Sequence, residues 1–195
     1  MITLYRTNNS IIGEFQVGSV KEAVELAVRQ GISLANANLA FKDLANVSLE
    51  GANCADANFT GTNLMWVRLE GANCKGANFA GANLKWANCK GANLTNANLR
   101  WANFTGANLS SADLMGAVLT KANFTDANFD FAAISLQCKS TEAIVDDRFA
   151  AQLAHLLTRQ DYSNCSEEVK RDIDIIKSLS VTNLLAKYRN DVKPI

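Results

Sequence analysis

The feature that most constrains this chain is a repeat with a period of five residues. Counting from Leu34, every fifth residue up to Ile134 is apolar: Leu in 12 cases, Phe in 5, Cys in 3 and Ile once. The residue two positions earlier is Ala in 16 of these 21 repeats, and the residue one position earlier is Asn or Asp in 16. A period of five fits neither the 3.6 residues of a helical turn nor the two of an isolated strand. The chain therefore has to turn once in every five residues over 32–136.

The composition of the repeat indicates which positions face inward. The central apolar residue and the small Ala before it are expected to share a narrow core, in which a larger side chain would overpack. We expect the Asn or Asp before the central residue at a corner, because these residues accept turn conformations. We expect the same of the residue two positions after the central one, which is Gly in eight repeats.

The repeating unit, as in Ala77-Asn78-Phe79 and Ala92-Asn93-Leu94, resembles the A(N/D)LXX motif of the pentapeptide-repeat family. The resemblance covers residues 32–136 without an insertion. It implies the fold of that family: an all-β solenoid, namely a right-handed quadrilateral β-helix in which four pentapeptides make one square coil.

The N-terminal flank, residues 1–31, is expected to form a hairpin plus a capping helix. Residues 2–17 predict a hairpin with Asn8-Asn9-Ser10 as its turn. Ser19-Val20-Lys21-Glu22 has the form of a capping box, and Gly31 is expected to end the helix that follows. Since a solenoid exposes bare core at its ends, we expect this flank to act as an N-terminal plug.

The C-terminal flank, residues 137–195, loses the five-residue register and is expected to be a helical extension. Two apolar stripes with helical spacing support this expectation: Val145, Phe149, Leu153 and Leu156, then Val169, Ile173, Ile176 and Leu179. The extension is predicted to cover the last coil as a cap or to form a homodimer through its helices.

Charge and cysteine content favour a neutral cytoplasmic protein. The 19 basic residues balance the 19 acidic ones, and the repeats themselves contain seven of each, so neither direct nucleic-acid binding nor an anionic membrane partner is expected. No stretch approaches the length of a membrane span, and the N-terminus lacks the pattern of a signal peptide. Five cysteines without compact spacing fit reduced thiols.

The sequence offers no constellation for catalysis, and we expect neither a metal nor a cofactor. The one histidine, His155, has no Ser or Cys at helical spacing, and Cys138 and Cys165 lack zinc-ligand spacing. Cys54 and Cys74 are predicted to stack one coil apart and to point inward as small hydrophobic residues.

Two functional classes remain. The first is a non-enzymatic scaffold that binds a partner protein through its outer faces. The second is a DNA mimic acting on a type II topoisomerase (DNA gyrase), as the resemblance to the family's quinolone-resistance members implies, although those members present acidic surfaces. An enzyme within the C-terminal helices ranks third.

The candidate binding site is a set of residues that the register directs outward: Phe41, Trp66, Trp86 and Trp101, with Met65 and Lys85 preceding two of them. Trp66 and Trp86 are 20 residues apart, which predicts that they stack on one side of the rod, with Phe41 and Trp101 on the adjoining side. Exposed Trp beside Met and Lys is typical of interface cores. The alternative is that the terminal helices fold back and cover these rings.

Overall fold

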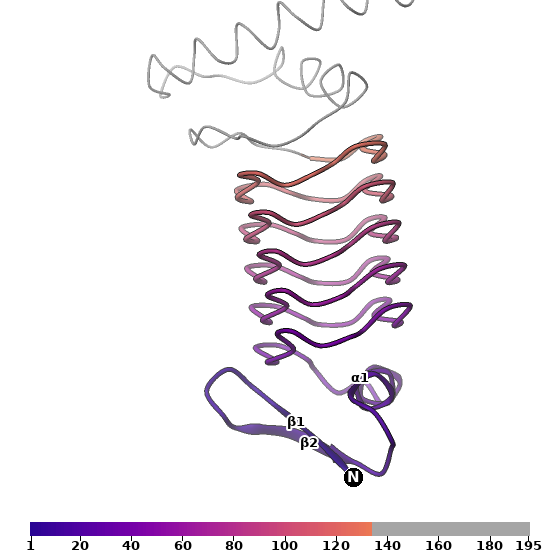
Figure 1. Ribbon diagram of the computed structural model, residues 1–195, viewed down its shortest axis with the longest axis vertical. Helices are drawn as coiled ribbons and strands as arrows, with labels where there is room; N and C mark the ends of the chain where they lie inside the picture. Colours follow the sequence, from indigo (N-terminus) through magenta and orange to yellow (C-terminus); the bar gives the residue numbers. More distant parts are fainter. Residues whose placement is uncertain (134–195) are drawn as a thin grey trace, which may run out of the picture.

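The computed structural model describes residues 1–133, and residues 134–195, with the expected C-terminal helices, lie outside the described residues. The strands β1 (Ile2–Tyr5) and β2 (Ile11–Phe15) come first, followed by the helix α1 (Val20–Arg29). Residues 34–133 form a stack of square coils, with the hairpin and α1 at one end (Figure 1). The chain therefore turns as the five-residue period requires.

Each coil contains 20 residues, because the parallel bridges join residues separated by that number, as in Asn38↔Asn58 and Asn58↔Asn78. The same spacing governs the backbone hydrogen bonds around such a bridge. Leu39 N donates to Asn58 O at 2.9 Å, and Asn58 N donates to Ala37 O at 2.8 Å. Every side of a coil is thus tied to the coils before and after it, as in a parallel sheet.

The interior of the rod is one continuous apolar core. The central residues of the repeats are fully buried, and so are the alanines two positions earlier, with few exceptions. Phenylalanines one coil apart stack directly, with ring centroids 4.8 Å apart for Phe59 and Phe79. Phe104 and Phe124 stack in the same way at 5.1 Å. The inward assignment of both positions is confirmed.

The corners lie at the residue two positions after each central residue. From Asn36 to Phe131 every residue at this position has a positive φ, between 55° and 71°. Eight of these residues are glycine, which adopts the left-handed conformation without cost, whereas the others are L residues held in a sparsely populated region.

Asn at the position before the central residue is not the positive-φ corner residue that we expected. It lies on a side of the rod, where its Oδ1 accepts a hydrogen bond from the backbone two residues on, as Asn78 does from Ala80 N at 3.1 Å. Its Nδ2 donates to the residue one coil earlier, as from Asn83 to Asn63 at 3.2 Å and from Asn98 to Asn78 at 3.0 Å. These contacts form Asn ladders that run along the rod.

The N-terminal segment contains the expected hairpin and helix. β1 and β2 pair antiparallel, and Asn9 has a positive φ of 64° in the turn between them. Ser19 caps α1 by accepting a hydrogen bond from Glu22 N at 3.1 Å. Ala23, Val24 and Ala27 of α1 join the core of the rod, and Arg6 forms a bridge with Ala37 of the first coil. The role of this segment as a plug stays a prediction.

Candidate functional site: an aromatic face of the rod

The four candidate aromatic residues stand at corners and point outward. Phe41, Trp66, Trp86 and Trp101 have positive φ values of 57°, 60°, 55° and 56°. They retain 78%, 50%, 42% and 60% of their surface exposed. The left-handed conformation costs an L residue about 1–2 kcal/mol, and exposure forgoes the gain from burial. The stability of the rod therefore does not explain why these corners carry aromatic side chains.

The rings lean along the rod toward the following coil. A Cβ atom added to Gly61 would lie 2.6 Å from Phe41 Cε1, and one added to Gly106 would lie 2.5 Å from Trp86 Cδ1. Phe41 therefore covers Gly61, and Trp86 covers Gly106. By contrast, nothing lies within 4 Å of a Cβ built on Gly81.

Trp66 and Trp86 form the expected stack. Their ring centroids are 4.9 Å apart with an interplanar angle of 17°. Lys85 Nζ lies 4.9 Å from the centroid of the Trp86 ring, within the range of a cation–π interaction. Stacking and the cation–π contact contribute about 0.5–1.5 and 0.5–1 kcal/mol, respectively, enough to offset part of the backbone cost at this pair.

The two sets of aromatic residues belong to neighbouring corners. The first corner holds Phe41, Gly61, Gly81 and Trp101, and the second corner holds Asn46, Trp66, Trp86 and Gly106. The side between them consists of residues 42–45, 62–65, 82–85 and 102–105. We call this side, with its two corners, the aromatic face.

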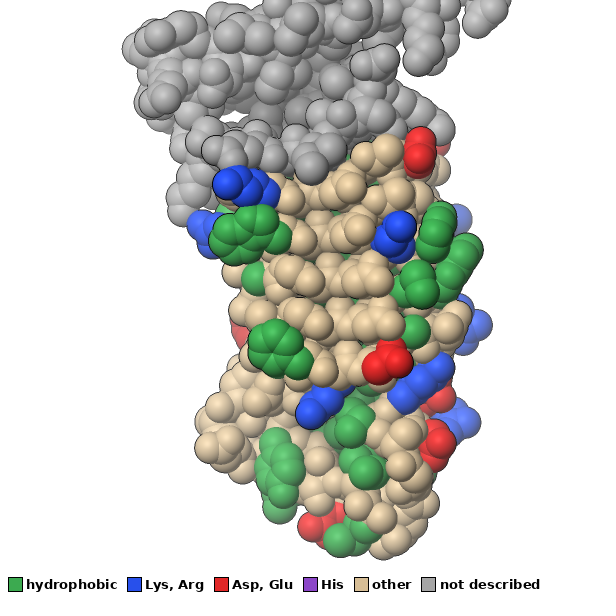
Figure 2. Space-filling model, in the orientation of Figure 1, with side chains coloured by type: hydrophobic (Ala, Val, Ile, Leu, Met, Phe, Trp, Pro, Cys, Tyr) green, Lys and Arg blue, Asp and Glu red, His purple; other side chains and the backbone are tan. Residues whose placement is uncertain are grey.

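Between its corners the aromatic face carries Met65 and Lys85 beside an Asn ladder. The ladder continues to Asp43, whose Oδ1 accepts from Asn63 Nδ2 at 2.9 Å. In the view of Figure 2, hydrophobic side chains stand at both lateral edges of the rod. The surface between them is mostly polar and uncharged, with a few Lys, Arg, Asp and Glu side chains. Among the described residues the four rings stay 42–78% exposed, and whether residues 134–195 cover them lies outside the described part.

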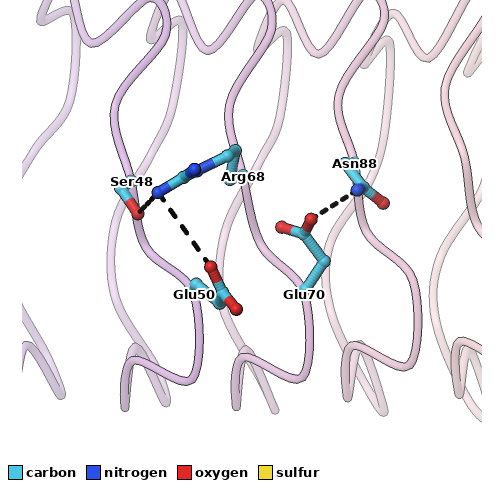
Figure 3. Close-up of polar contacts among 5 residues, drawn as sticks. All are labelled: Ser48, Glu50, Arg68, Glu70 and Asn88. Carbon is cyan, nitrogen blue, oxygen red and sulfur yellow. Dashed lines mark hydrogen bonds and ion pairs between the residues drawn. The ribbon is translucent and has the colours of Figure 1, made fainter.

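The adjoining side, beyond the Trp66–Trp86 corner, is where an Asn ladder is interrupted (Figure 3). Arg68 replaces Asn there, and its guanidinium donates to Ser48 Oγ at 2.8 Å and lies 4.0 Å from Glu50 Oε2. Because residue 68 is not Asn, Asn88 Nδ2 finds no amide oxygen one coil earlier and donates instead to Glu70 Oε1. Glu70 Oε2 is buried and has no hydrogen-bond partner among the described residues. Sequence reasoning did not single out these residues, although Arg at an Asn position was a visible signal.

The described thiols are buried and unreactive in character. Cys54, Cys74 and Cys89 are free and fully buried. A hydrogen bond with Cys54, followed by burial, raises the pKa of the Cys74 thiol well above its usual range. Burial, with a smaller contribution from the Glu70 carboxylate, raises the pKa of Cys89 to about 12. Since the thiolate is the nucleophile, these residues behave as small apolar side chains.

Within residues 1–133 no group of three His, Cys, Asp or Glu side chains could hold a metal ion. His155, Cys138 and Cys165 lie outside the described residues. No helix in the described part is long and apolar enough to cross a membrane.

Twenty-residue square coils with an Ala-Asn-Leu-type repeat define a pentapeptide solenoid. A family model described as pentapeptide repeats matches this chain in eight copies, over residues 30–65, 62–100, 82–120 and 97–132. The chain belongs to the pentapeptide repeat family, whose fold is the right-handed quadrilateral β-helix.

Solved structures include similar rods. A pentapeptide repeat protein from the thylakoid lumen of Arabidopsis thaliana is 23% identical with a TM-score of 0.51, and the match covers 74% of this chain and 84% of that chain. A pentapeptide repeat protein from Nostoc PCC 7120 is 26% identical with a TM-score of 0.47, over 68% and 100% of the two chains. QnrB1, a plasmid-mediated fluoroquinolone resistance protein, is 18% identical with a TM-score of 0.23, over 63% and 70%. No curated protein sequence matches the chain.

Proposed function

We propose that this protein is a non-enzymatic scaffold that binds a partner protein through its aromatic face. One observation carries the proposal: four aromatic side chains occupy left-handed corner positions of a single face and remain 42–78% exposed. Other corners have Gly or Asn in the same backbone conformation, as at Gly81 and Asn96. Residues that cost the fold stability without joining its core are expected to serve binding.

The composition of the face fits a protein partner. Trp and Met are enriched in the centres of protein interfaces, where large rings lose their water on contact. Lys85 adds one cation at the edge of Trp86, and the ladder asparagines supply hydrogen-bonding groups around the rings. A rigid rod also presents these groups with little loss of conformational freedom on binding.

The test is the double substitution Trp66→Ala with Trp86→Ala. Alanine retains the cost of the left-handed backbone, so the variant removes the rings and little else. We expect far-ultraviolet circular dichroism to show a folded rod and capture of the partner protein by the immobilised chain to fail. The matched control is Asp56→Ala with Asn96→Ala, which alters two left-handed residues on a corner outside the aromatic face.

Two outcomes would overturn the proposal. If the Trp66/Trp86 double variant unfolds while the control stays folded, the rings belong to the internal packing of the rod. If both variants capture the same protein with equal affinity, the binding surface lies elsewhere.

Mimicry of DNA against DNA gyrase remains the second function to test. The repeats contain seven basic and seven acidic residues, so the rod lacks the uniform negative charge that would replace phosphates. We expect the purified protein not to inhibit gyrase supercoiling at concentrations near that of the enzyme. Stoichiometric inhibition would favour mimicry over the scaffold.

A further inference from the structure

The two corners of the aromatic face carry their rings at different levels of the rod. On the first corner, Phe41 lies over Gly61. We expect Trp101, which has nearly the same φ, 56° against 57°, to lean in the same direction, toward the level of Lys121. On the second corner, Trp86 lies over Gly106, and its stacking partner Trp66 lies one coil earlier. Each level that holds a ring on one corner therefore lacks a ring on the other.

We propose that the aromatic face binds the aromatic face of a second copy of this chain, with the two rods parallel about a two-fold axis along their length. The proposal rests on the proposed function of this face as a protein-binding surface, and it names the partner. It differs from the expected dimer through residues 137–195, which would leave the face free.

Symmetry decides what would meet across this interface. A closed two-fold dimer allows no translation along the axis, so each coil faces the same coil of the second copy. A rotation about an axis along the rod also exchanges the corners, so the first corner of one copy lies opposite the second corner of the other. The open corner at Gly81 then lies opposite the Trp66 ring, and the Phe41 ring lies opposite the ring-free level of the second corner.

The remaining contacts agree with this register. The exchange of corners also pairs the end of each side with its beginning. Met65 would lie nearest Thr62 and Asn63 of the second copy, and Lys85 nearest Ala82 and Asn83, so the two copies of Lys85 would not lie opposite each other. An antiparallel pairing centred on the rings would instead place Phe41 against Trp101 and Trp66 against Trp86. Ring would then face ring at both corners, and the space at Gly81 would stay unfilled.

The exposed aromatic area is close to what a stable dimer needs. With about 200 Å² per aromatic side chain, the exposed fractions of 78%, 50%, 42% and 60% correspond to about 460 Å² on each copy. Two copies together offer about 900 Å² from the rings alone, close to the roughly 1,000 Å² expected of a specific interface before the intervening side chains are counted.

The test is the oligomeric state of the full chain, measured by sedimentation over a range of concentrations. Gly81→Asp places a carboxylate opposite the Trp66 ring. Gly91→Asp is the control, because Gly91 has a nearly equal φ, 64° against 66°, and equally open surroundings on the diagonally opposite corner. Aspartate is tolerated at such corners, as at Asp56 and Asp126. We expect a dimer for the wild type and for Gly91→Asp. For Gly81→Asp we expect the dissociation constant of the dimer to rise at least tenfold, so that the monomer predominates.

The orientation is tested with spin labels on either end of the rod. Cysteine is introduced at Ala40 or at Thr120, both on the side beyond the first corner, in full-length protein with Cys138→Ser and Cys165→Ser. Parallel rods predict the same label-to-label distance at both positions, whereas antiparallel rods predict different distances.

The outcomes separate this proposal from the proposed function. A wild type that is monomeric at all concentrations, a dimer that Gly81→Asp and Gly91→Asp affect equally, or unequal label distances would each overturn the parallel dimer. If the chain is monomeric but the Trp66/Trp86 double variant still loses capture of another protein, the scaffold function stands and only the second copy is wrong.

Discussion

Most of the alanines two positions before a central residue lie inside the rod without exposed surface, as Ala92 does. Because the interior is close-packed, a larger side chain has to displace the backbone. We expect Ala92→Leu to lower the free energy of unfolding by about 1–3 kcal/mol or more, measured by denaturant titration. Ala55→Leu, at the outward position after Cys54, is the control and should change it by less than about 0.5 kcal/mol. Equal midpoints for the two variants would contradict the inward assignment.

Cys89 predicts a dependence of stability on alkaline pH. Its pKa is about 12 in the folded rod, against an ordinary value of 9.0, because the buried thiolate is disfavoured. The contribution of the neutral thiol to stability is therefore complete below about pH 9 and is lost as the pH rises toward 12. Between pH 8 and pH 10.5 we expect the free energy of unfolding of the wild type to fall by about 1–2 kcal/mol more than that of Cys89→Val. Parallel losses in the two proteins would show that this thiol does not titrate as described.

At the scale of the element, the Asn ladders join successive coils along the sides of the rod. A five-residue motif shows that Asn recurs, but it does not show that its partner is 20 residues away. The sequence therefore predicted the residue type and not its place, and Asn was expected at the corner instead of on the side. The left-handed corner falls two positions after the central residue, where Gly is common but Phe and Trp also occur.

The interrupted ladder offers a direct measure of what these bonds contribute. Arg68→Asn would place an amide oxygen where Asn88 Nδ2 can donate, and Glu70 would be released from that contact. Asn88 would then bond to the amide oxygen of residue 68 instead of to the partly unsatisfied carboxylate of Glu70, which should raise the free energy of unfolding by about 1 kcal/mol. Thermal denaturation of Arg68→Asn and Arg68→Ala distinguishes the effect of gaining a ladder hydrogen bond from the effect of losing the guanidinium, because both variants lose the guanidinium and only Arg68→Asn gains the bond. A melting temperature for Arg68→Asn no higher than that for Arg68→Ala would argue against this account.

At the scale of the whole molecule, the period of five predicted the shared apolar core, and the resemblance to the pentapeptide-repeat family implied the 20-residue coil and, with it, the stacking of Trp66 on Trp86. All three are confirmed. The period could not predict the lean of the rings or the shared side between Phe41 and Trp66. Both depend on the backbone conformation at the corners and on the neighbouring coil, so they required coordinates.

Because four corners complete a coil, each five-residue repeat turns the chain by a quarter turn about the rod axis. Duplicating residues 87–91 would advance everything beyond them by one corner and carry Trp101 into the place of Gly106, next above Trp86. We expect a folded rod with three stacked tryptophans, seen as a stronger near-ultraviolet circular dichroism signal, whereas four such insertions would return Trp101 to the corner of Phe41. An unchanged signal after one insertion would mean that the extra residues bulge out as a loop. The number of residues between two positions thus sets the side of the rod on which each lies, and an insertion can move a surface to another side without changing any residue in that surface.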